Sequence, residues 1–461
     1  MSFRLTRRAL LGSLLASPLL AAAPSSPSSL HIVRKGDADY ASARINKNRA
    51  VTSLPQAVAY AFDERDVIAA LRYAKDAGLP ISVRSGGHDY EGFSTNDNGL
   101  VIDLSRFDGI AIDREDGSCR VAPGVLLRTL YHRLFTEASA SLPAGSCGTV
   151  GVSGLTLGGG FGPLGRMHGL LCDRLRAVRL VDAAGELRTS AADPDLLWAC
   201  RGGGGGNFGI VTEFVFDLVA VPAIVTTFSL NPGWNAGVAR TAALAFTQSA
   251  PNLPREISPT LLLSRNENAV ELFGLSLLGE PQTQSALREI VLAIGGTLTT
   301  NRVPYLAAVE RGAGNDTDVA CWKMTSSFLG GPLSGDGCDA VTRALIAPHS
   351  GQVQFELFGG SIARLRQDAS AFWHRDKSVL IQCQSYWRDP EKGQPERAWV
   401  ASAFASIDPH TTRSSYRNYC DLALTDWPVR YYGANYARLQ QIKARLDAQN
   451  RFSYPQSIRL P

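Results

Sequence analysis

Hydrophobic residues recur along this chain with two periods, and each period predicts a different kind of element. Between residues 66 and 78 the apolar side chains of Val67, Ile68, Leu71 and Ala74 follow the spacing of one helix face. A helix is therefore expected there, and the glycine that ends the segment suits a helix C-terminus. The same pattern predicts helices over residues 125–135 and 435–450, and strands over residues 81–83, 100–104, 175–181 and 210–218.

Alternation with period two predicts two strands in the second half of the chain. In QVQFELFGG one face carries Gln354 and Glu356, and in SVLIQCQSYW one face carries Gln382 and Tyr386, while the opposite faces are apolar. A polar sheet face either meets bulk water or roofs a polar substrate site. The pattern by itself leaves both alternatives open.

Length and composition set the scale of the fold. A chain of 461 residues is expected to form one large or two medium domains, and its composition is that of a folded protein with abundant glycine. The glycine clusters thin out near residues 221–222, where alternating strands and helices follow. We therefore expect a domain boundary at this point.

Residues 1–23 have the features of an export signal. Arg7 and Arg8 precede an apolar run over residues 10–20, and small residues follow at 21–23. This order predicts a twin-arginine signal peptide, and hence a bacterial protein exported to the periplasm or the medium. An ordinary signal peptide with two chance arginines is the alternative. No other stretch is long and apolar enough to span a membrane.

Charge and cysteine spacing argue against several classes of partner. The formal net charge is +4, and removal of the leader with Arg4, Arg7 and Arg8 leaves +1. A nearly neutral protein suits neither nucleic acid nor an anionic membrane, so we expect neither as a partner. The 8 cysteines include no C-x-x-C pair and no metal-ligand spacing. No metal site is predicted, and the pairing of the cysteines is left open.

Glycine-rich stretches expose backbone N–H groups that can cradle a pyrophosphate. They are RSGGHDYEG over residues 84–92, PAGSCGTVGVSGLTLGGGFGPLGRMHGL over residues 143–170 and RGGGGGNFGIVT over residues 201–212. Neither of the last two fits the fingerprint of a nicotinamide dinucleotide site, which needs G-x-G-x-x-G directly after a strand. His88 follows the glycine pair of the first stretch and suits a ligand, a base or a point of covalent attachment.

The motifs VRSGGHDYEG, GSCGTVGVSGLTLGGGFG, GLLCDRL, WACRGGGGGNFGIVTEF, YRNYCD and YYGANYARLQQIKARLDAQNRF follow one another along nearly all of the chain after the leader. In this order they resemble the berberine bridge enzyme-like family of the vanillyl-alcohol oxidase (PCMH-type) flavoprotein superfamily. The resemblance implies a two-lobed α+β fold. Residues 31–222 and the C-terminal segment 424–461 are expected to form the FAD lobe. Residues 223–423 are expected to form the substrate lobe around an antiparallel sheet. We expect a monomer.

The resemblance further implies covalently bound FAD. In this family the histidine of SGGH, here His88, bonds to the flavin 8-methyl position, and a cysteine at the place of Cys147 bonds to flavin C6. A thiolate is the nucleophile, and glycine-rich turns lower the pKa of a thiol. A buried or disulfide-bonded cysteine is the alternative at this position. The other residues that the motifs place at the cofactor are Ser85, Gly86, Gly87, Gly145, Gly148, Val150, Gly151, Gly154, Gly159, Gly160, Gly209, Ile210 and Asn435.

The same resemblance implies the groups of an alcohol-oxidising site. Tyr419 takes the place of the tyrosine that removes the proton of the substrate hydroxyl while hydride passes to flavin N5, and Glu356 that of its acidic partner. A core tyrosine and a plain residue of a polar sheet face are the alternatives for these two. The expected substrate contacts are Tyr90, Gln354, Gln382 and Tyr386.

Val150 bears on the electron acceptor. It lies three residues after Cys147, where valine accompanies oxidases and leucine accompanies dehydrogenases in the resembled family. One added methylene is enough to fill an oxygen-sized space in a packed interior. We therefore expect an exported oxidase of sugars or other alcohols that reduces O2 to H2O2. A natural-product tailoring oxidase or dehydrogenase, and a flavin-loaded protein without turnover, are the alternatives.

Overall fold

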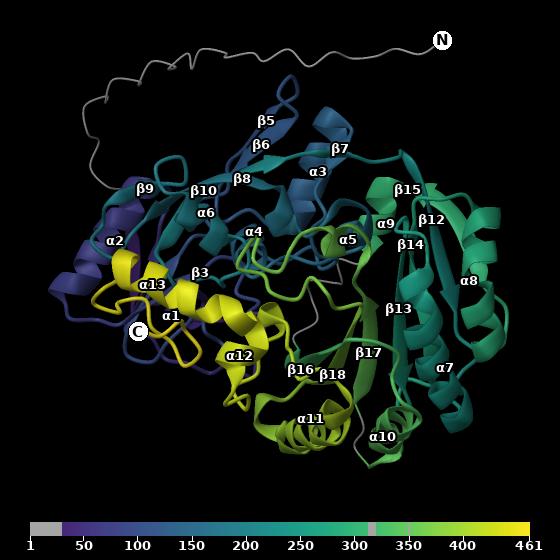
Figure 1. The fold of residues 1–461 in the computed structure, drawn as a ribbon. Helices are drawn as coiled ribbons and strands as arrows, with labels where there is room; N and C mark the ends of the chain where they lie inside the picture. The colour runs from purple at the N-terminus through teal and green to yellow at the C-terminus, as the bar shows by residue number, and fades with distance from the viewer. Residues whose placement is uncertain (1–29, 312–319, 349–350) are drawn as a thin grey trace, which may run out of the picture.

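The computed structural model describes residues 30–311, 320–348 and 351–461, which form two lobes that lie side by side (Figure 1). The predicted signal peptide, residues 1–23, lies outside the described residues. Within the described ranges no helix is long and apolar enough to cross a membrane. Helices and sheets are mixed throughout, which confirms the expected α+β class.

Two sheets form the framework of the first lobe. One has the order β1-β2-β4-β3, with β2, β4 and β3 parallel, and the other is antiparallel with the order β5-β6-β10-β8-β9. Helix α2 contacts both sheets, because its apolar face shares one core cluster with strands of each. The strands are β1 (His31–Arg34), β2 (Ala57–Tyr60), β3 (Ile81–Arg84), β4 (Leu100–Asp103), β5 (Ile110–Asp113), β6 (Ser118–Val121), β8 (Leu175–Val181), β9 (Leu187–Thr189) and β10 (Ile210–Asp217), with a short pair of β7 (Ala140–Ser141) and β11 (Val219–Ala220). The helices are α1 (Tyr40–Ala43), α2 (Glu64–Asp76), α3 (Leu127–Ala138), α4 (Val152–Leu157), α5 (Gly165–His168) and α6 (Pro194–Cys200).

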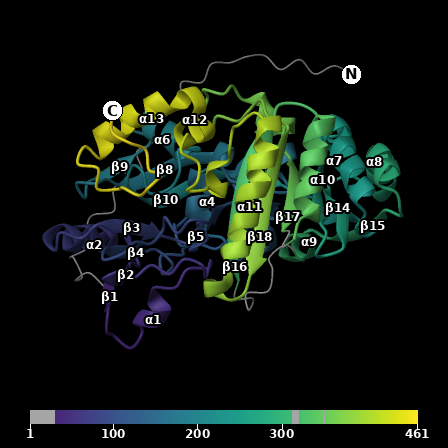
Figure 2. The same cartoon turned by 90° about the horizontal axis from the view of Figure 1, so that it is seen from below.

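A seven-stranded antiparallel sheet with the order β15-β12-β14-β13-β17-β18-β16 forms the second lobe. Helices α7, α8, α10 and α11 cover one of its faces (Figure 2), because Val353, Phe355 and Ile381 belong to the same buried cluster as these helices. The strands are β12 (Ile224–Leu230), β13 (Ile257–Ser264), β14 (Ala269–Ser276), β15 (Thr299–Pro304), β16 (Cys321–Leu329), β17 (Gln352–Leu357) and β18 (Val379–Trp387). The helices are α7 (Ala236–Ser249), α8 (Glu280–Ile294), α9 (Tyr305–Arg311), α10 (Gly335–Ile346) and α11 (Gln394–Ile407).

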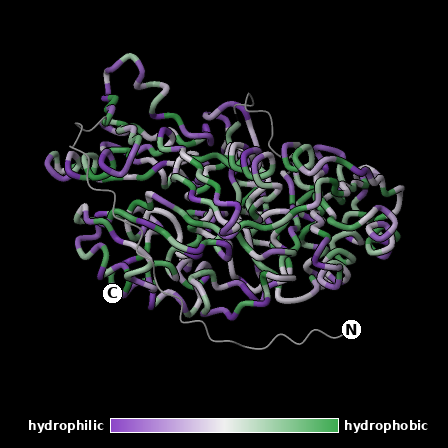
Figure 3. The backbone as a smooth tube through the Cα atoms, turned by 90° about the horizontal axis from the view of Figure 1, so that it is seen from above, coloured by the Kyte–Doolittle hydropathy of each residue, from purple (hydrophilic) through white to green (hydrophobic). Residues whose placement is uncertain are grey.

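The last part of the chain returns to the first lobe. Helices α12 (Trp427–Tyr432) and α13 (Tyr436–Leu446), yellow in Figure 1, lie against it, and Leu439 and Ile442 are buried in its core. Figure 3 shows the resulting distribution, with hydrophobic positions gathered inside both lobes and hydrophilic positions toward the outside.

Helix α13 is shorter than the helix expected over residues 435–450. It ends at Leu446 because Asp447 leaves the helical region, with φ −146°, and its carboxylate accepts hydrogen bonds from Lys443 Nζ at 2.7 Å and from Phe452 N–H at 2.8 Å. Lys443 also donates to the carbonyl of Asn207 at 2.8 Å. This buried ion pair therefore fastens the helix to the third glycine-rich stretch. The other predicted helices and strands agree with the structure to within three residues.

Arg166 in α5 ties the two lobes together. Its side chain is fully buried and donates to the backbone carbonyls of Leu253 at 2.8 Å, Ile257 at 2.9 Å and Phe358 at 2.5 Å. Ile257 opens β13 and Phe358 follows β17, so a guanidinium of the first lobe satisfies carbonyl groups at one end of the second-lobe sheet. Burial lowers the pKa of Arg166 to about 10, which leaves it charged at neutral pH.

Replacement of this arginine tests the tie between the lobes. Arg166→Met keeps an unbranched side chain but removes every donor, and each buried carbonyl left without a partner costs about 1–3 kcal/mol. We expect the free energy of unfolding, measured with urea, to fall by about 3–5 kcal/mol. Arg366→Met is the control, because the Arg366 side chain is 83% exposed, and it should change stability by no more than about 0.5 kcal/mol. Equal stability of the two variants would contradict this role.

Candidate active site

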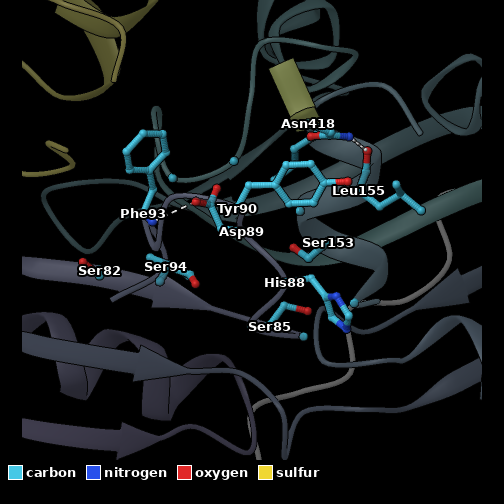
Figure 4. Close-up of a pocket in the computed structure, with 18 of the residues that line it drawn as sticks. Ser82, Ser85, His88, Asp89, Tyr90, Phe93, Ser94, Ser153, Leu155 and Asn418 are labelled. Carbon is cyan, nitrogen blue, oxygen red and sulfur yellow. Dashed lines mark hydrogen bonds between the residues drawn. The ribbon is translucent and has the colours of Figure 1, made fainter. Parts of the chain in front are cut away.

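A cavity of about 410 Å³ lies between the two lobes. Its first-lobe walls come from the loop after β3, from the start of α4 and from the third glycine-rich stretch (Figure 4). Strands β16 and β18 supply the second-lobe wall, and two segments on either side of α12 and α13 complete it. Ten of the predicted cofactor residues line this cavity, namely Ser85, Gly86, Gly87, His88, Cys147, Val150, Gly151, Gly154, Gly209 and Ile210.

The glycines at the cavity let two loops cross and leave bare backbone toward the interior. A Cβ on Gly86 would lie 2.3 Å from the backbone nitrogen of Gly151, and a Cβ on Gly151 would lie 2.5 Å from that of Gly86. No larger residue fits at either position without moving backbone. A Cβ on Gly154 would meet nothing within 4 Å, so this residue instead exposes the start of α4 to the cavity.

The structure brings His88 and Cys147 to one place. The Nε2 atom of His88 lies 2.8 Å from Thr149 Oγ1, and the Cys147 sulfur lies 3.4 Å from the same oxygen. The imidazole also stacks on the indole of Trp322 in β16, with ring centroids 6.1 Å apart. Each cysteine of the described residues is a free thiol, and these residues contain no group of three His, Cys, Asp or Glu side chains that suits a metal ion.

Tyr419 and Glu356 form a hydrogen-bonded pair beside the cavity. The phenol of Tyr419, which lines the cavity, donates to Glu356 Oε1 at 3.3 Å. Burial raises the pKa of Glu356 to about 7, against the lowering effect of this hydrogen bond. Burial and the neighbouring carboxylate both raise the pKa of Tyr419 well above its ordinary value. The carboxylate is therefore the member of the pair that changes protonation near neutral pH.

The central residues on the polar faces of β17 and β18 are enclosed. Gln382 is 2% exposed and Glu356 is 9% exposed, which decides between the two alternatives in favour of an enclosed polar site. Gln382 donates to Tyr90 Oη at 3.4 Å, and the Tyr90 ring stacks on Tyr419 with centroids 5.5 Å apart. Tyr386 is half-exposed and lines the cavity. Gln354 lies one step away from the cavity and accepts a hydrogen bond from a glutamine of β18.

Some predicted cofactor residues lie outside the cavity. Gly160 N–H donates to the phenol of Tyr416 at 2.8 Å, and the carbonyl of Gly145 accepts from Tyr131 at 2.6 Å. The side-chain amide of Asn435 donates to the carbonyls of Gln367, Ser370 and Ala371. The five residues concerned are Gly145, Gly148, Gly159, Gly160 and Asn435. In the structure they support the surrounding loops, and direct contact with a cofactor stays a prediction for them.

Several cavity residues escaped the sequence analysis. Trp322 and Met324 alternate along β16, and that strand carries no glycine or glutamine pattern to single it out. Between them, Lys323 forms ion pairs with Glu91 and, at 2.6 Å, with Asp421. This buried lysine joins the second-lobe sheet to the loop of His88 and to the segment of Tyr419. Further lining residues outside the predicted set include Arg417, Asn418, Phe452 and Tyr454, and Thr149 contacts His88 beside the cavity.

Comparison with known proteins gives consistent matches over most of the chain. The family model "FAD binding domain" matches residues 55–191, and "Berberine and berberine like" matches residues 415–459. Aclacinomycin-N/aclacinomycin-A oxidase of Streptomyces galilaeus is 30% identical over 86% of this chain and 83% of its own. Chitooligosaccharide oxidase of Gibberella zeae is 28% identical over 88% and 87%. The structure of BBE-like 1 from Physcomitrella patens matches with a TM-score of 0.88 at 26% identity, over 94% and 98%.

The cavity fits FAD on its own chemistry. Bare glycine backbone faces one side, and the apolar residues Ile81, Leu104 and Phe452 line the part within the first lobe. The nucleophilic side chains of His88 and Cys147 lie at the same cavity. These walls suit a long ligand with a phosphate group and flat rings. Fold, site and comparisons agree, and the chain belongs to the berberine bridge enzyme-like family of FAD-linked oxidoreductases.

Proposed function

We propose that this enzyme oxidises a hydroxyl group of a sugar, an oligosaccharide or another alcohol, with O2 as the acceptor of electrons. The observation that carries the proposal is the hydrogen-bonded pair of the partly buried Tyr419 and the buried Glu356, which lies on the polar face of the second-lobe sheet. Similarity to chitooligosaccharide oxidase supports a hydroxyl-rich substrate. Val150 in the cavity wall supports O2 as the acceptor, because the smaller side chain leaves space where leucine would fill it.

The chain's own residues handle the proton of the substrate hydroxyl. Bound FAD supplies the acceptor for the hydride. Tyr419 Oη takes the hydroxyl proton while its own proton passes to Glu356 Oε1, so that no buried tyrosinate has to persist. The stacked ring of Tyr90 and the amide of Gln382 hold the tyrosine in place. Glu356 is suited to accept the proton near neutral pH because its pKa is raised to about 7.

A natural-product alcohol is the second candidate substrate. Trp322 and Tyr386 present aromatic surfaces to the cavity, and such surfaces suit a ligand with flat or apolar rings. Similarity to aclacinomycin oxidase supports the same reading. The two candidates share the proton transfer and differ in what fills the cavity beyond it.

A substrate panel tests the proposed function. We expect purified enzyme to consume O2 and release H2O2 with mono- or oligosaccharides. Simple aliphatic alcohols should not be oxidised, because they would leave the polar side chains of the second-lobe sheet without hydrogen-bond partners. Turnover only with polycyclic natural-product alcohols would select the second candidate. Reduction of an artificial dye by substrate, without O2 consumption, would contradict the oxidase and indicate a dehydrogenase.

The pH profile tests the Tyr419–Glu356 pair. Only the carboxylate form accepts a proton, so kcat/KM of the wild type should fall as the pH drops through about 7. Glu356→Gln should lower kcat by about 10²–10⁴-fold and remove this limb, and Tyr419→Phe should lower kcat as much with unchanged flavin content. Glu289→Gln, an exposed change on α8 beyond the sheet, is the control and should keep the wild-type profile. An unchanged limb in Glu356→Gln would reject the assignment.

We also propose attachment of FAD through both His88 and Cys147, supported by their shared contact with Thr149. Each attachment replaces one hydrogen on the flavin and one on the side chain, and O2 takes up the two electrons and two protons. Acid precipitation should leave all flavin in the protein pellet of the wild type. His88→Ala and Cys147→Ala should each retain flavin, and the double variant should release it. Free flavin in the wild-type supernatant would refute covalent attachment.

A further inference from the structure

Arg417 is a buried cation at the cavity without an anion at hand. It is the sole lysine or arginine among the described residues that line the cavity, and it is 6% exposed. The described residues place no carboxylate oxygen within 4 Å of its nitrogens. The other buried arginines have an anion or several carbonyls as partners, Arg84 through Asp103, Arg375 through Asp173, Arg430 through Asp408, and Arg166 through three carbonyls.

Aromatic rings surround this guanidinium on the protein side. Its central carbon lies 5.5 Å from the ring centroid of Phe93, 5.6 Å from that of Tyr454 and 6.0 Å from that of Tyr431. The Nη2 atom donates to Tyr454 Oη at 3.0 Å. Aromatic ring faces attract a cation, but they carry no net negative charge that would neutralise it. The protein thus holds the group in place without neutralising it.

One donor of Arg417 has no partner in the described part of the chain and lies close to the third glycine-rich stretch. Nε has no hydrogen-bond partner among the described residues. A Cβ on Gly204, where φ is +89°, would lie 3.2 Å from this atom, and the next two glycines, Gly205 and Gly206, line the cavity. A buried donor without a partner beside a cavity is open to a hydrogen bond from a ligand, and at Arg417 this donor belongs to the one cation that lines the described cavity.

The nearby carboxylate does not fill this role. Asp89 is the one acidic residue among the described residues that line the cavity, and its Oδ1 accepts the backbone N–H groups of Glu91 at 3.1 Å and Phe93 at 2.9 Å. Figure 4 shows Asp89 turned to the backbone of its own loop. Asp89 acts on Arg417 through its charge but forms no ion pair with it, and the Nε donor of Arg417 stays open to a ligand.

We propose that Arg417 is the counter-charge of bound FAD, neutralising a negatively charged group of the cofactor. FAD carries such charge on its diphosphate and, once reduced, at the N1–C2=O edge of its ring. Glycine N–H groups offer dipoles to an anion but carry no net charge. Arg417 supplies the positive charge, together with the planar set of N–H donors of its guanidinium. The inference needs only that FAD binds in this cavity, and it holds for an oxidase and a dehydrogenase alike.

The position of Arg417 links the cofactor to the catalytic pair. Arg417 and Tyr419 are the first and last residues of one short 3-10 helix, and Asn418 between them donates to the carbonyl of Leu155 at 3.0 Å. An anion drawn to Arg417 therefore holds the same segment that places the phenol. The cofactor contact and the catalytic phenol are thus carried by one short segment.

The test compares Arg417→Gln and Arg417→Lys with the wild type. Two quantities are measured on purified protein, the FAD content per chain from absorbance and the midpoint potential from reductive titration against a reference dye. If the partner is the diphosphate, Arg417→Gln should lose about tenfold or more in FAD content at limiting FAD, with an unchanged potential in the loaded fraction. If the partner is the reduced flavin ring, the midpoint potential of the flavin in Arg417→Gln should fall. The fall should be about 30 mV for each tenfold weaker stabilisation of the reduced form. Arg417→Lys keeps the charge and should lie between Gln and the wild type.

Two further variants guard against a general folding defect. Arg417→Met fills the aromatic surroundings without charge and should show the same losses as Arg417→Gln, so a poorly folded Gln variant does not end the test. Arg430→Gln removes a buried arginine that already has a carboxylate partner and should lower the melting temperature without changing the potential or the FAD content of folded protein. Unchanged FAD content and potential in both uncharged Arg417 variants would overturn the proposal. Equal losses in Arg430→Gln would overturn it as well.

Discussion

Polar groups of one lobe that are satisfied by partners from the other hold the walls of the cavity together. Arg166 of the first lobe donates to three second-lobe carbonyls, and Lys323 of the second-lobe sheet pairs with Glu91 and Asp421. A lobe that moved away would leave a buried charge without a partner, which is strongly unfavourable. Hydrogen bonds and ion pairs are directional, so these ties fix the relative placement of the lobes in a way that apolar contact alone does not.

This enclosure also gives the site its chemistry. Glu356 would titrate as an ordinary carboxyl on an open sheet, but the first lobe covers its strand and burial raises its pKa to about 7. The same cover brings Tyr90 and Tyr419 into a stack and turns the glutamines of β17 and β18 inward. The proposed proton transfer and substrate recognition thus depend on the interface between the lobes.

Local patterns explain what the sequence predicted well. Period-two alternation predicted β17 and β18 and their apolar faces, and helical spacing predicted α2, because both patterns follow from burial of one face of one element. The loss of the last turn of the helix expected up to residue 450 shows the limit. The helix ends early where the carboxylate of Asp447 accepts hydrogen bonds from Lys443 and from the backbone of Phe452. The spacing of apolar residues within the segment does not reveal such contacts.

The order of short motifs along the sequence was enough to indicate the α+β class and the flavin-binding stretches, and it singled out His88 and Cys147 as candidates for attachment, because glycine runs and short motifs act through the backbone around them. Only the tertiary structure decided that the polar strand faces are enclosed, that Thr149 touches both His88 and Cys147, and that Arg417 is buried without an anion. The neighbours of Arg417 are Phe93, Tyr431 and Tyr454, which come from separate parts of the chain. Whether a charged side chain is paired or open to a ligand depends on the groups packed around it. Those groups come from distant parts of the sequence, so only the tertiary structure shows them.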